Sequence, residues 1–236
     1  MIFDAARTAA FELISPPFRA VFFKTLGLTV LALVALWLGL TSLVEWLALP
    51  WLQTLLPGLP SWAGLIGSII AAIALAFGMA LLIAPVTAVV AGLFLDDIAE
   101  VVERTDYPLD APGRAMPALR SLVLALRFLG VVILGNLVAL LLLLVPGINI
   151  AAFFVVNGYL LGREFFEFAA MRFRPEDEAR ALRKRYAGTV FLAGLVISAF
   201  LAIPLLNLVT PLFAAAMMVH LHKAISARET ARFPRA

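Results

Sequence analysis

The residue types that carry enzyme chemistry are sparse in this chain and form no catalytic pattern. The sequence has no cysteine, no glycine-rich phosphate loop, no Ser/His/Asp set and no His-Glu-x-x-His motif. Its two histidines, His220 and His222, are two positions apart and would point in different directions on a helix. No acidic residue stands near them in the sequence. We therefore predict that the chain is not an enzyme, uses no cofactor and has no metal site.

A few charged residues lie in or beside apolar segments, where an unpaired charge is expensive. Arg163 and Glu167 are one helical turn apart, and Glu164 lies between them in the sequence. Arg127 stands alone in its own apolar run. We expect Arg127 to form an ion pair with Glu164 or Glu167. The four residues would then make a membrane ion-pair network, either structural or pore-lining.

Three acidic residues, Asp96, Glu100 and Glu103, fall on one helical face, which would suit a cation site or a solvated surface. Glu100 and Arg104 have the i,i+4 spacing of a favourable helical ion pair. This pair favours a solvated acidic face.

A short pattern of proline followed by asparagine occurs twice, as Pro146-Gly147-Ile148-Asn149-Ile150 and Pro204-Leu205-Leu206-Asn207-Leu208. Proline stops a helix, and asparagine can cap the next one. Thr210, which is followed by proline, offers a second helix start. The segments either simply turn the chain or place helix N-termini, which attract anions, inside a membrane. The candidate pore residues are Pro146, Asn149, Pro204, Asn207 and Thr210.

On a helix over residues 1–15, apolar side chains would fall on one face and charged side chains on the opposite face, as in a helix that lies in a membrane interface. Ser15-Pro16-Pro17 ends this pattern, and Ser15 can cap a following helix that contains Arg19. An arginine at a capped helix start suits an oxyanion, or it anchors the chain to lipid phosphate. Ser15 and Arg19 are therefore the candidate anion-binding residues.

The elements that position these residues must be membrane helices. Apolar residues make up 64% of the 236 residues, charged residues 14%, and the mean hydropathy is +1.05. A soluble domain has roughly 45–50% apolar and about 25% charged residues. The composition also excludes collagen, a disordered chain and a nucleic-acid-binding arm. The sequence therefore predicts an all-α integral membrane protein, with the lipid bilayer as its first partner.

Basic residues cluster at both termini and in two long polar segments, but are missing between Thr25 and Ile98. The positive-inside rule then places both termini in the cytoplasm and the loop around residues 50–60 outside. We expect one membrane domain over 1–236: an interfacial helix over 1–15, a first crossing over 20–48, a second crossing with a cytoplasmic extension over 61–104, a first hairpin over 117–172, a charged cytoplasmic segment over 173–187 and a second hairpin over 188–228.

Each of the two later apolar segments begins and ends on the cytoplasmic side. In the second hairpin, the arms 188–203 and 210–223 reach roughly 24 and 21 Å as helices, against a hydrocarbon core of about 30 Å. A re-entrant hairpin explains these lengths. The first hairpin is ambiguous, because 120–145 is long enough to span while 149–162 is short. We interpret it as a second partly penetrating hairpin, alongside two long transmembrane helices.

Two motifs together resemble the CysZ-type sulfate permease family: Asn157-Gly158-Tyr159-Leu160-Leu161-Gly162-Arg163-Glu164-Phe165-Phe166-Glu167, and Ile203-Pro204-Leu205-Leu206-Asn207-Leu208-Val209-Thr210-Pro211 running into Val219-His220. The resemblance implies a multi-pass protein of the bacterial inner membrane that takes up sulfate for cysteine synthesis. It also implies two long transmembrane helices with two hemi-penetrating hairpins, assembled as dimers or higher homo-oligomers. The family's sulfate-binding Gly-Leu-Arg-Arg segment corresponds to residues 17–20, where Arg19 is the residue that carries over.

Two functions from different classes remain open. The first is an anion channel or permease for sulfate or a related oxyanion, with capture near Arg19 and passage past the hairpin tips. The second is a non-transporting membrane scaffold or lipid-interacting protein of the same fold, working through its amphipathic N-terminus and the segment 173–186. Neither function involves nucleic acid.

Overall fold

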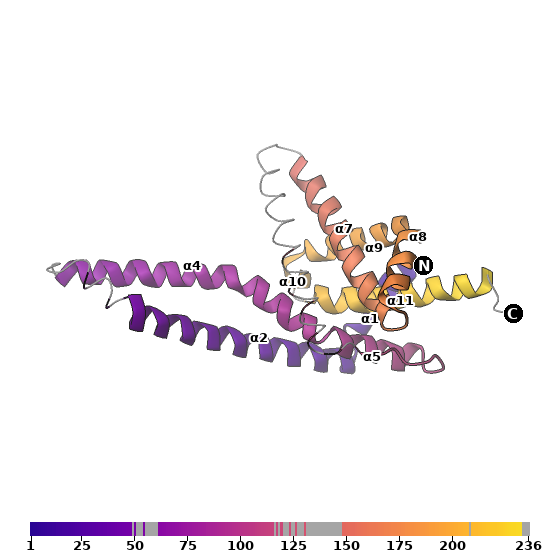
Figure 1. Cartoon of the computed structure of the whole chain (residues 1–236), viewed down its shortest axis with the longest axis horizontal. Helices are drawn as coiled ribbons and strands as arrows, with labels where there is room; N and C mark the ends of the chain where they lie inside the picture. Colours follow the sequence, from indigo (N-terminus) through magenta and orange to yellow (C-terminus); the bar gives the residue numbers. More distant parts are fainter. Residues whose placement is uncertain are drawn as a thin grey trace. The chain divides into compact units, whose positions relative to one another are not determined.

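The computed structural model describes residues 1–48, 50, 54, 61–115, 117, 119, 123, 126, 130, 148–207 and 209–232. These residues form helices and no strand, which confirms the predicted all-α class (Figure 1). The helices are α1 (Ile2–Glu12), α2 (Pro16–Leu43), the π-helix η1 (Val44–Ala48), α4 (Ser61–Leu93), α5 (Leu95–Asp106), α7 (Ile148–Met171), α8 (Glu176–Arg185), α9 (Ala187–Leu201), α10 (Pro204–Asn207) and α11 (Thr210–Arg232).

The chain divides into two compact units. The first contains Met1–Phe23 and Ala91–Ala236, and the second contains Lys24–Val90. The division falls inside α2 and α4, so the second unit contains α2 from Lys24 onward, η1, and α4 as far as Val90.

The second unit exposes apolar side chains along its helices. The segment Pro16–Trp46, 31 residues long, is long and apolar enough to cross a membrane, and 6% of its most apolar window is buried within the protein. Leu31 and Leu38 on α2, and Ile73 and Phe77 on α4, are each more than half exposed. A helix that is apolar around its whole circumference and uncovered by protein suits lipid rather than water. The number of crossings and their orientation remain predictions.

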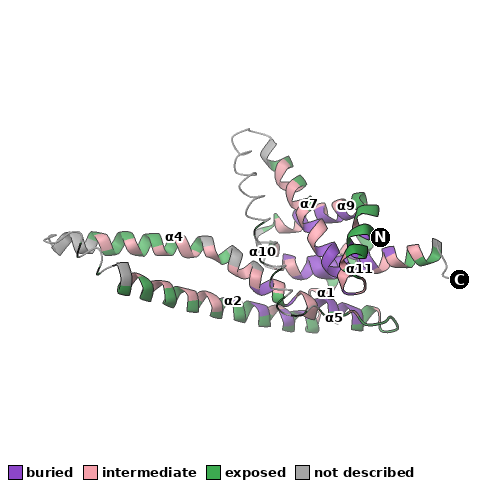
Figure 2. Cartoon of the chain, in the orientation of Figure 1, coloured by how far each residue is buried: buried purple, intermediate pink, exposed green. Residues whose placement is uncertain are grey.

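The first unit contains the packed core, drawn in purple in Figure 2. Helix α11 lies at its centre and contacts α1, α5, α7 and α9. Its segment 212–219 is buried on every side, including Phe213, Met217 and Met218. The Phe213 ring stacks on Phe200 of α9 at 4.1 Å between centroids. Because the segment 212–219 of α11 is apolar all round and covered by protein, its sequence is that of a core helix as much as a membrane helix.

Glycines allow α7 and α9 to approach closely. A Cβ atom added to Gly194 of α9 would lie 1.9 Å from the carbonyl oxygen of Gly158, and one added to Gly162 would lie 2.5 Å from that of Val190. No side chain fits at such distances. Gly158 and Gly162 form the small-xxx-small spacing that brings helix backbones together in membrane proteins.

Two helix breaks shape the first unit. Helices α8 and α9 are bent by 89° at Tyr186, so the charged helix α8 turns away from the apolar helix α9. Helix α9 ends at Leu201 and α11 begins at Thr210, with the short helix α10 between them. The expected proline turn of the second hairpin lies in this interval. Its depth in a membrane is a prediction.

The expected helix over 61–104 is interrupted. Helix α4 ends at Leu93, Phe94 forms a turn, and α5 begins at Leu95. The break falls close to the point where the chain passes from the second unit to the first. Helix α5 is amphipathic and buries Ile98, Ala99 and Val102 in the first unit, whereas the body of α4 belongs to the second.

Candidate functional site

The predicted anion-binding residues lie at the start of α2. Ser15 immediately precedes the helix, its N–H donates to the carbonyl of Glu12 at 2.8 Å, and its carbonyl accepts the N–H of Arg19 at 3.0 Å. Phe18 is buried, whereas Arg19 on the next position is exposed. Pro16 and Pro17 at the start of α2 have no N–H, and the N–H groups of Ser15 and Arg19 are already bonded to carbonyls. The exposed Arg19 guanidinium is therefore the main group that this helix start offers to an anion.

The predicted tip of the second hairpin is partly described. Asn207 ends α10 and is exposed, while Thr210 begins α11 and is buried. The Thr210 hydroxyl donates to the carbonyl of Leu206 at 3.0 Å, so it links α10 to α11. The side chain of Pro204 lies outside the described residues. Pro146 and the side chain of Asn149, which mark the first tip, lie outside them too.

Glu167 of the predicted ion-pair network is buried, and its nearest described partner was not foreseen. The Arg183 Nε of α8 lies 2.6 Å from the Glu167 Oε1, and the Arg163 Nε lies 3.8 Å from the same oxygen. The sharp turn between α8 and α9 brings Arg183 onto α7, which the linear sequence did not indicate. Glu164, half-buried, lies on the same helix, and Arg127 lies outside the described residues.

A second buried ion pair corrects the prediction of a solvated acidic face on α5. Glu103 is 5% exposed, and its carboxylate binds the Arg172 guanidinium through two contacts, Nε to Oε1 at 2.7 Å and Nη2 to Oε2 at 3.2 Å. Arg172 also binds Asp96. The N–H of Gly113 donates to the Glu103 Oε2 at 2.9 Å. Glu103 is buried because it faces the core formed with α7 and α11.

The local part of that prediction is confirmed. Glu100 and Arg104 form an ion pair on the exposed surface of α5. Their i,i+4 spacing is a property of the helix itself and needs no tertiary contact.

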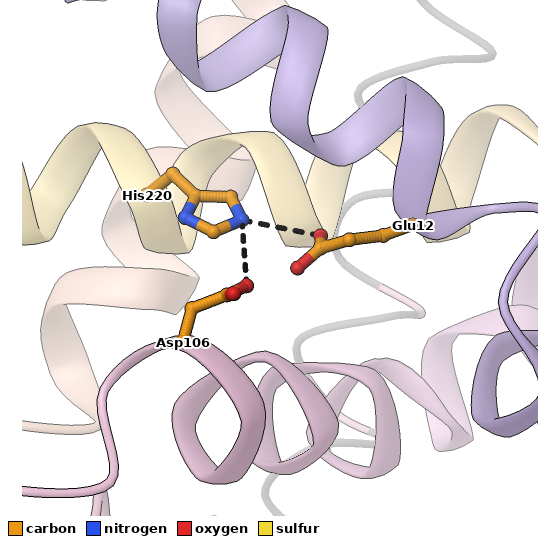
Figure 3. Close-up of side chains that lie close together, drawn as sticks. All are labelled: Glu12, Asp106 and His220. Carbon is orange, nitrogen blue, oxygen red and sulfur yellow. Dashed lines mark hydrogen bonds and ion pairs between the residues drawn. The ribbon is translucent and has the colours of Figure 1, made fainter.

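A further cluster contradicts the expectation that His220 has no acidic partner. Figure 3 shows the Glu12 and Asp106 carboxylates converging on the His220 ring. The His220 Nε2 lies 3.1 Å from the Glu12 Oε2 and 3.7 Å from the Asp106 Oδ2. The Tyr107 hydroxyl lies 2.9 Å from the other ring nitrogen, Nδ1. His220 is 5% exposed and Glu12 is half-buried, whereas Asp106 is exposed, so the cluster opens to water on the Asp106 side.

Burial is the main cause of the pKa shifts of Glu12 and Tyr107. Burial raises the pKa of Glu12 to about 7, with the negative charge of Asp106 adding to the rise and the hydrogen bond with His220 opposing it. Burial also raises the pKa of Tyr107 to about 12, assisted by Asp106, Glu12 and Asp110. The phenol is therefore neutral at physiological pH.

Sequence reasoning missed the cluster because its members are far apart along the chain. Glu12 and Asp106 are the last residues of α1 and α5, and His220 is in the middle of α11. A usable signal exists, since α1 and α5 are both amphipathic and each must dock on an apolar helix.

The described residues thus define an all-helical, strongly apolar protein with one helix that is both long and apolar enough to cross a membrane, and with a helical core joined by buried ion pairs. The family described as Sulfate transporter CysZ/Etoposide-induced protein 2.4 matches residues 5–211, and the chain belongs to this family. The resemblance drawn from the two sequence motifs is confirmed. No curated protein matches the chain as an individual relative.

Proposed function

We propose that the protein is a multi-pass channel or permease of the bacterial inner membrane, which takes up sulfate or a related oxyanion for cysteine synthesis. The observation that carries this proposal is the match to the sulfate transporter family over residues 5–211. The apolar composition and the membrane-length helix Pro16–Trp46 support the membrane location. Neither a cofactor nor an enzymatic step is part of the proposal.

The proposed capture site is the start of α2. A sulfate ion is dianionic and accepts several hydrogen bonds, so a guanidinium together with a hydroxyl group suits it. Arg19 is exposed within the first turn of α2, and Ser15 precedes that turn. Arg19 supplies the positive charge and Ser15 a hydroxyl donor, since Pro16 and Pro17 have no N–H.

The proposed path continues past the two hairpin tips and the ion-pair network. Pro146, Asn149, Pro204, Asn207 and Thr210 would mark the tips, and Arg127, Arg163, Glu164 and Glu167 would line or brace the path. Non-helical backbone at membrane depth is tolerated where protein or a wet cavity surrounds it. Helices α9 and α10 end at residues 201 and 207, so the chain between α9 and α11 is not one continuous helix. This interruption supports the route. We further propose that the protein works as a homo-oligomer.

A lipid-interacting scaffold is the second candidate, and the exposed face of α1 favours it. Phe3 is 82% exposed and Phe11 is 65% exposed, although both are apolar. Such side chains are suited to the headgroup boundary of a bilayer. A transporter can also use such a helix, so anion flux separates the two functions.

The test is uptake of radiolabelled sulfate into proteoliposomes that contain the purified full-length chain. We expect uptake above that of empty liposomes, and about tenfold weaker uptake at low sulfate for Arg19→Ala, because a hydrogen bond to a charged group contributes roughly 1.5–3 kcal/mol.

Arg104→Ala is the matched control, since it removes an exposed arginine that pairs with Glu100 on α5. Its uptake should equal that of the unmodified protein. Folded protein that gives no more uptake than empty liposomes would contradict the transport function and leave the scaffold.

A further inference from the structure

The spacing of the Glu12, Asp106 and His220 side chains is that of a metal-ligand set. One potential ligand atom from each residue lies within 4.8 Å of the others. The His220 Nε2 is 3.1 Å from the Glu12 Oε2 and 3.7 Å from the Asp106 Oδ2. Nitrogen and oxygen ligands at about 2.0–2.2 Å from a tetrahedral zinc ion lie roughly 3.3–3.6 Å from one another. Small movements would therefore place all three atoms on one ion.

The His220 ring is oriented for this role by Tyr107. The Tyr107 hydroxyl lies 2.9 Å from the His220 Nδ1, on the opposite side of the ring from the carboxylates. When a bound cation displaces the proton from Nε2, the tautomer with its proton on Nδ1 can donate that proton to the phenol oxygen and direct the Nε2 lone pair at the ion. Metal-binding histidines are commonly held in this way through their second nitrogen.

The charges of the cluster also suit a cation. Two carboxylates face one imidazole, and within the described residues the structure pairs neither carboxylate with a lysine or arginine. Lys223, which lies over the Tyr107 ring, binds Asp110 instead, at 2.8 Å. The Glu12 Oε1 is buried without a hydrogen-bond partner. A divalent cation would balance the two carboxylates and give this oxygen a partner.

We propose that Glu12, Asp106 and His220 bind a divalent transition-metal cation, with Zn²⁺ as the best match to one imidazole and two carboxylates. The ligands come from α1, α5 and α11, so the ion joins the end of the N-terminal helix to the core of the first unit. A fourth coordination position is left for water. The site stands independently of sulfate uptake.

The test uses the full-length chain without an affinity tag, stripped with a chelator and kept in detergent. Zn²⁺ is titrated calorimetrically, and Co²⁺ is titrated by its visible absorption, which distinguishes four-coordinate from six-coordinate ions. We expect one ion per chain and the strong visible bands of four-coordinate Co²⁺. Glu12→Gln and His220→Gln should each weaken binding by more than about tenfold, and Tyr107→Phe by about tenfold, as for other residues that orient a metal ligand.

Glu100→Gln is the matched control, because it removes an exposed carboxylate from the same helix as Asp106. Its binding should be unchanged. Unmodified protein with an intact melting transition that binds neither ion in a 1:1 ratio would overturn the proposal, whatever the stability of the variants. Equal binding by unmodified protein and Glu12→Gln would overturn it as well. Because the readout is metal binding without sulfate, its failure is distinct from a failure of sulfate uptake.

Discussion

Charged side chains buried in the core of the first unit are stabilised by oppositely charged partners on other helices. The Arg172 side chain is 2% exposed and holds the carboxylates of Glu103 and Asp96 on α5. The carbonyl of Arg172 also accepts the N–H of Arg114 at 2.8 Å. This one residue therefore joins the end of α7 to α5 and to the segment that follows α5.

At the residue scale, we predict that Arg172→Met strongly destabilises the protein. The substitution leaves the buried Glu103 carboxylate without its counter-charge, and breaking a buried pair in this way costs about 3–5 kcal/mol. The free energy of unfolding, followed by far-ultraviolet circular dichroism in denaturant, should fall by that amount. The exposed arginine Arg104 provides the control. Arg104→Met should change it by less than about 0.5 kcal/mol, and a similar loss in both variants would contradict the assigned role of Arg172.

At the scale of the elements, the approach of α7 to α9 depends on three glycines. Gly158 and Gly162 lie one turn apart on α7 and face Gly194 on α9. At Gly162 and Gly194, backbone atoms, which cannot rotate away, occupy the space that a side chain would need, and at Gly158 the Leu195 side chain occupies it. The separation of the two helices is thus set by the absence of side chains along their contact.

The corresponding prediction compares two Gly→Ala variants. Gly194→Ala places a methyl group 1.9 Å from the Gly158 carbonyl oxygen, so the helices must separate, at a cost of about 1–3 kcal/mol or more. Gly78→Ala on α4 meets nothing within 4 Å and gains up to about 1 kcal/mol of helix propensity. The two variants should shift the melting temperature in opposite directions. An unchanged melting temperature for Gly194→Ala would show that α7 and α9 are less tightly packed than described.

At the scale of the whole molecule, the distribution of charge predicts which segments face which side of the membrane. The second unit presents apolar side chains along α2 and α4, whereas the charged helices α5 and α8 belong to the first unit. Because basic segments are retained in the cytoplasm, the loop around residues 50–60 should lie outside.

Single cysteines test this orientation cleanly, because the natural chain has none. Thr54→Cys, in the loop expected outside, should react with a membrane-impermeant maleimide in intact spheroplasts. Leu109→Cys should react after lysis alone, and its position is 99% exposed, so access within the protein does not limit the reaction. Labelling of both positions before lysis would refute the predicted orientation.

Sequence alone determined the features that arise from composition and from neighbours along one helix. The apolar excess indicated a helical membrane protein, and the i,i+4 spacing of Glu100 and Arg104 predicted their ion pair. Pro204 marked the interval in which α9 gives way to α11, and the motifs around residues 157–167 and 203–211 indicated the family that residues 5–211 match.

The tertiary structure decided the pairs that join different helices. It placed Arg183 on Glu167, buried Glu103 against Arg172, and brought Glu12 and Asp106 to His220. Helical periodicity specifies which residues share a face, but it does not specify which face meets which. That choice depends on the bend at Tyr186, on the glycine contact between α7 and α9, and on the position of α11 within the first unit. These features are collective properties of the packed helices, so the buried polar sites could be located only once the packing was known.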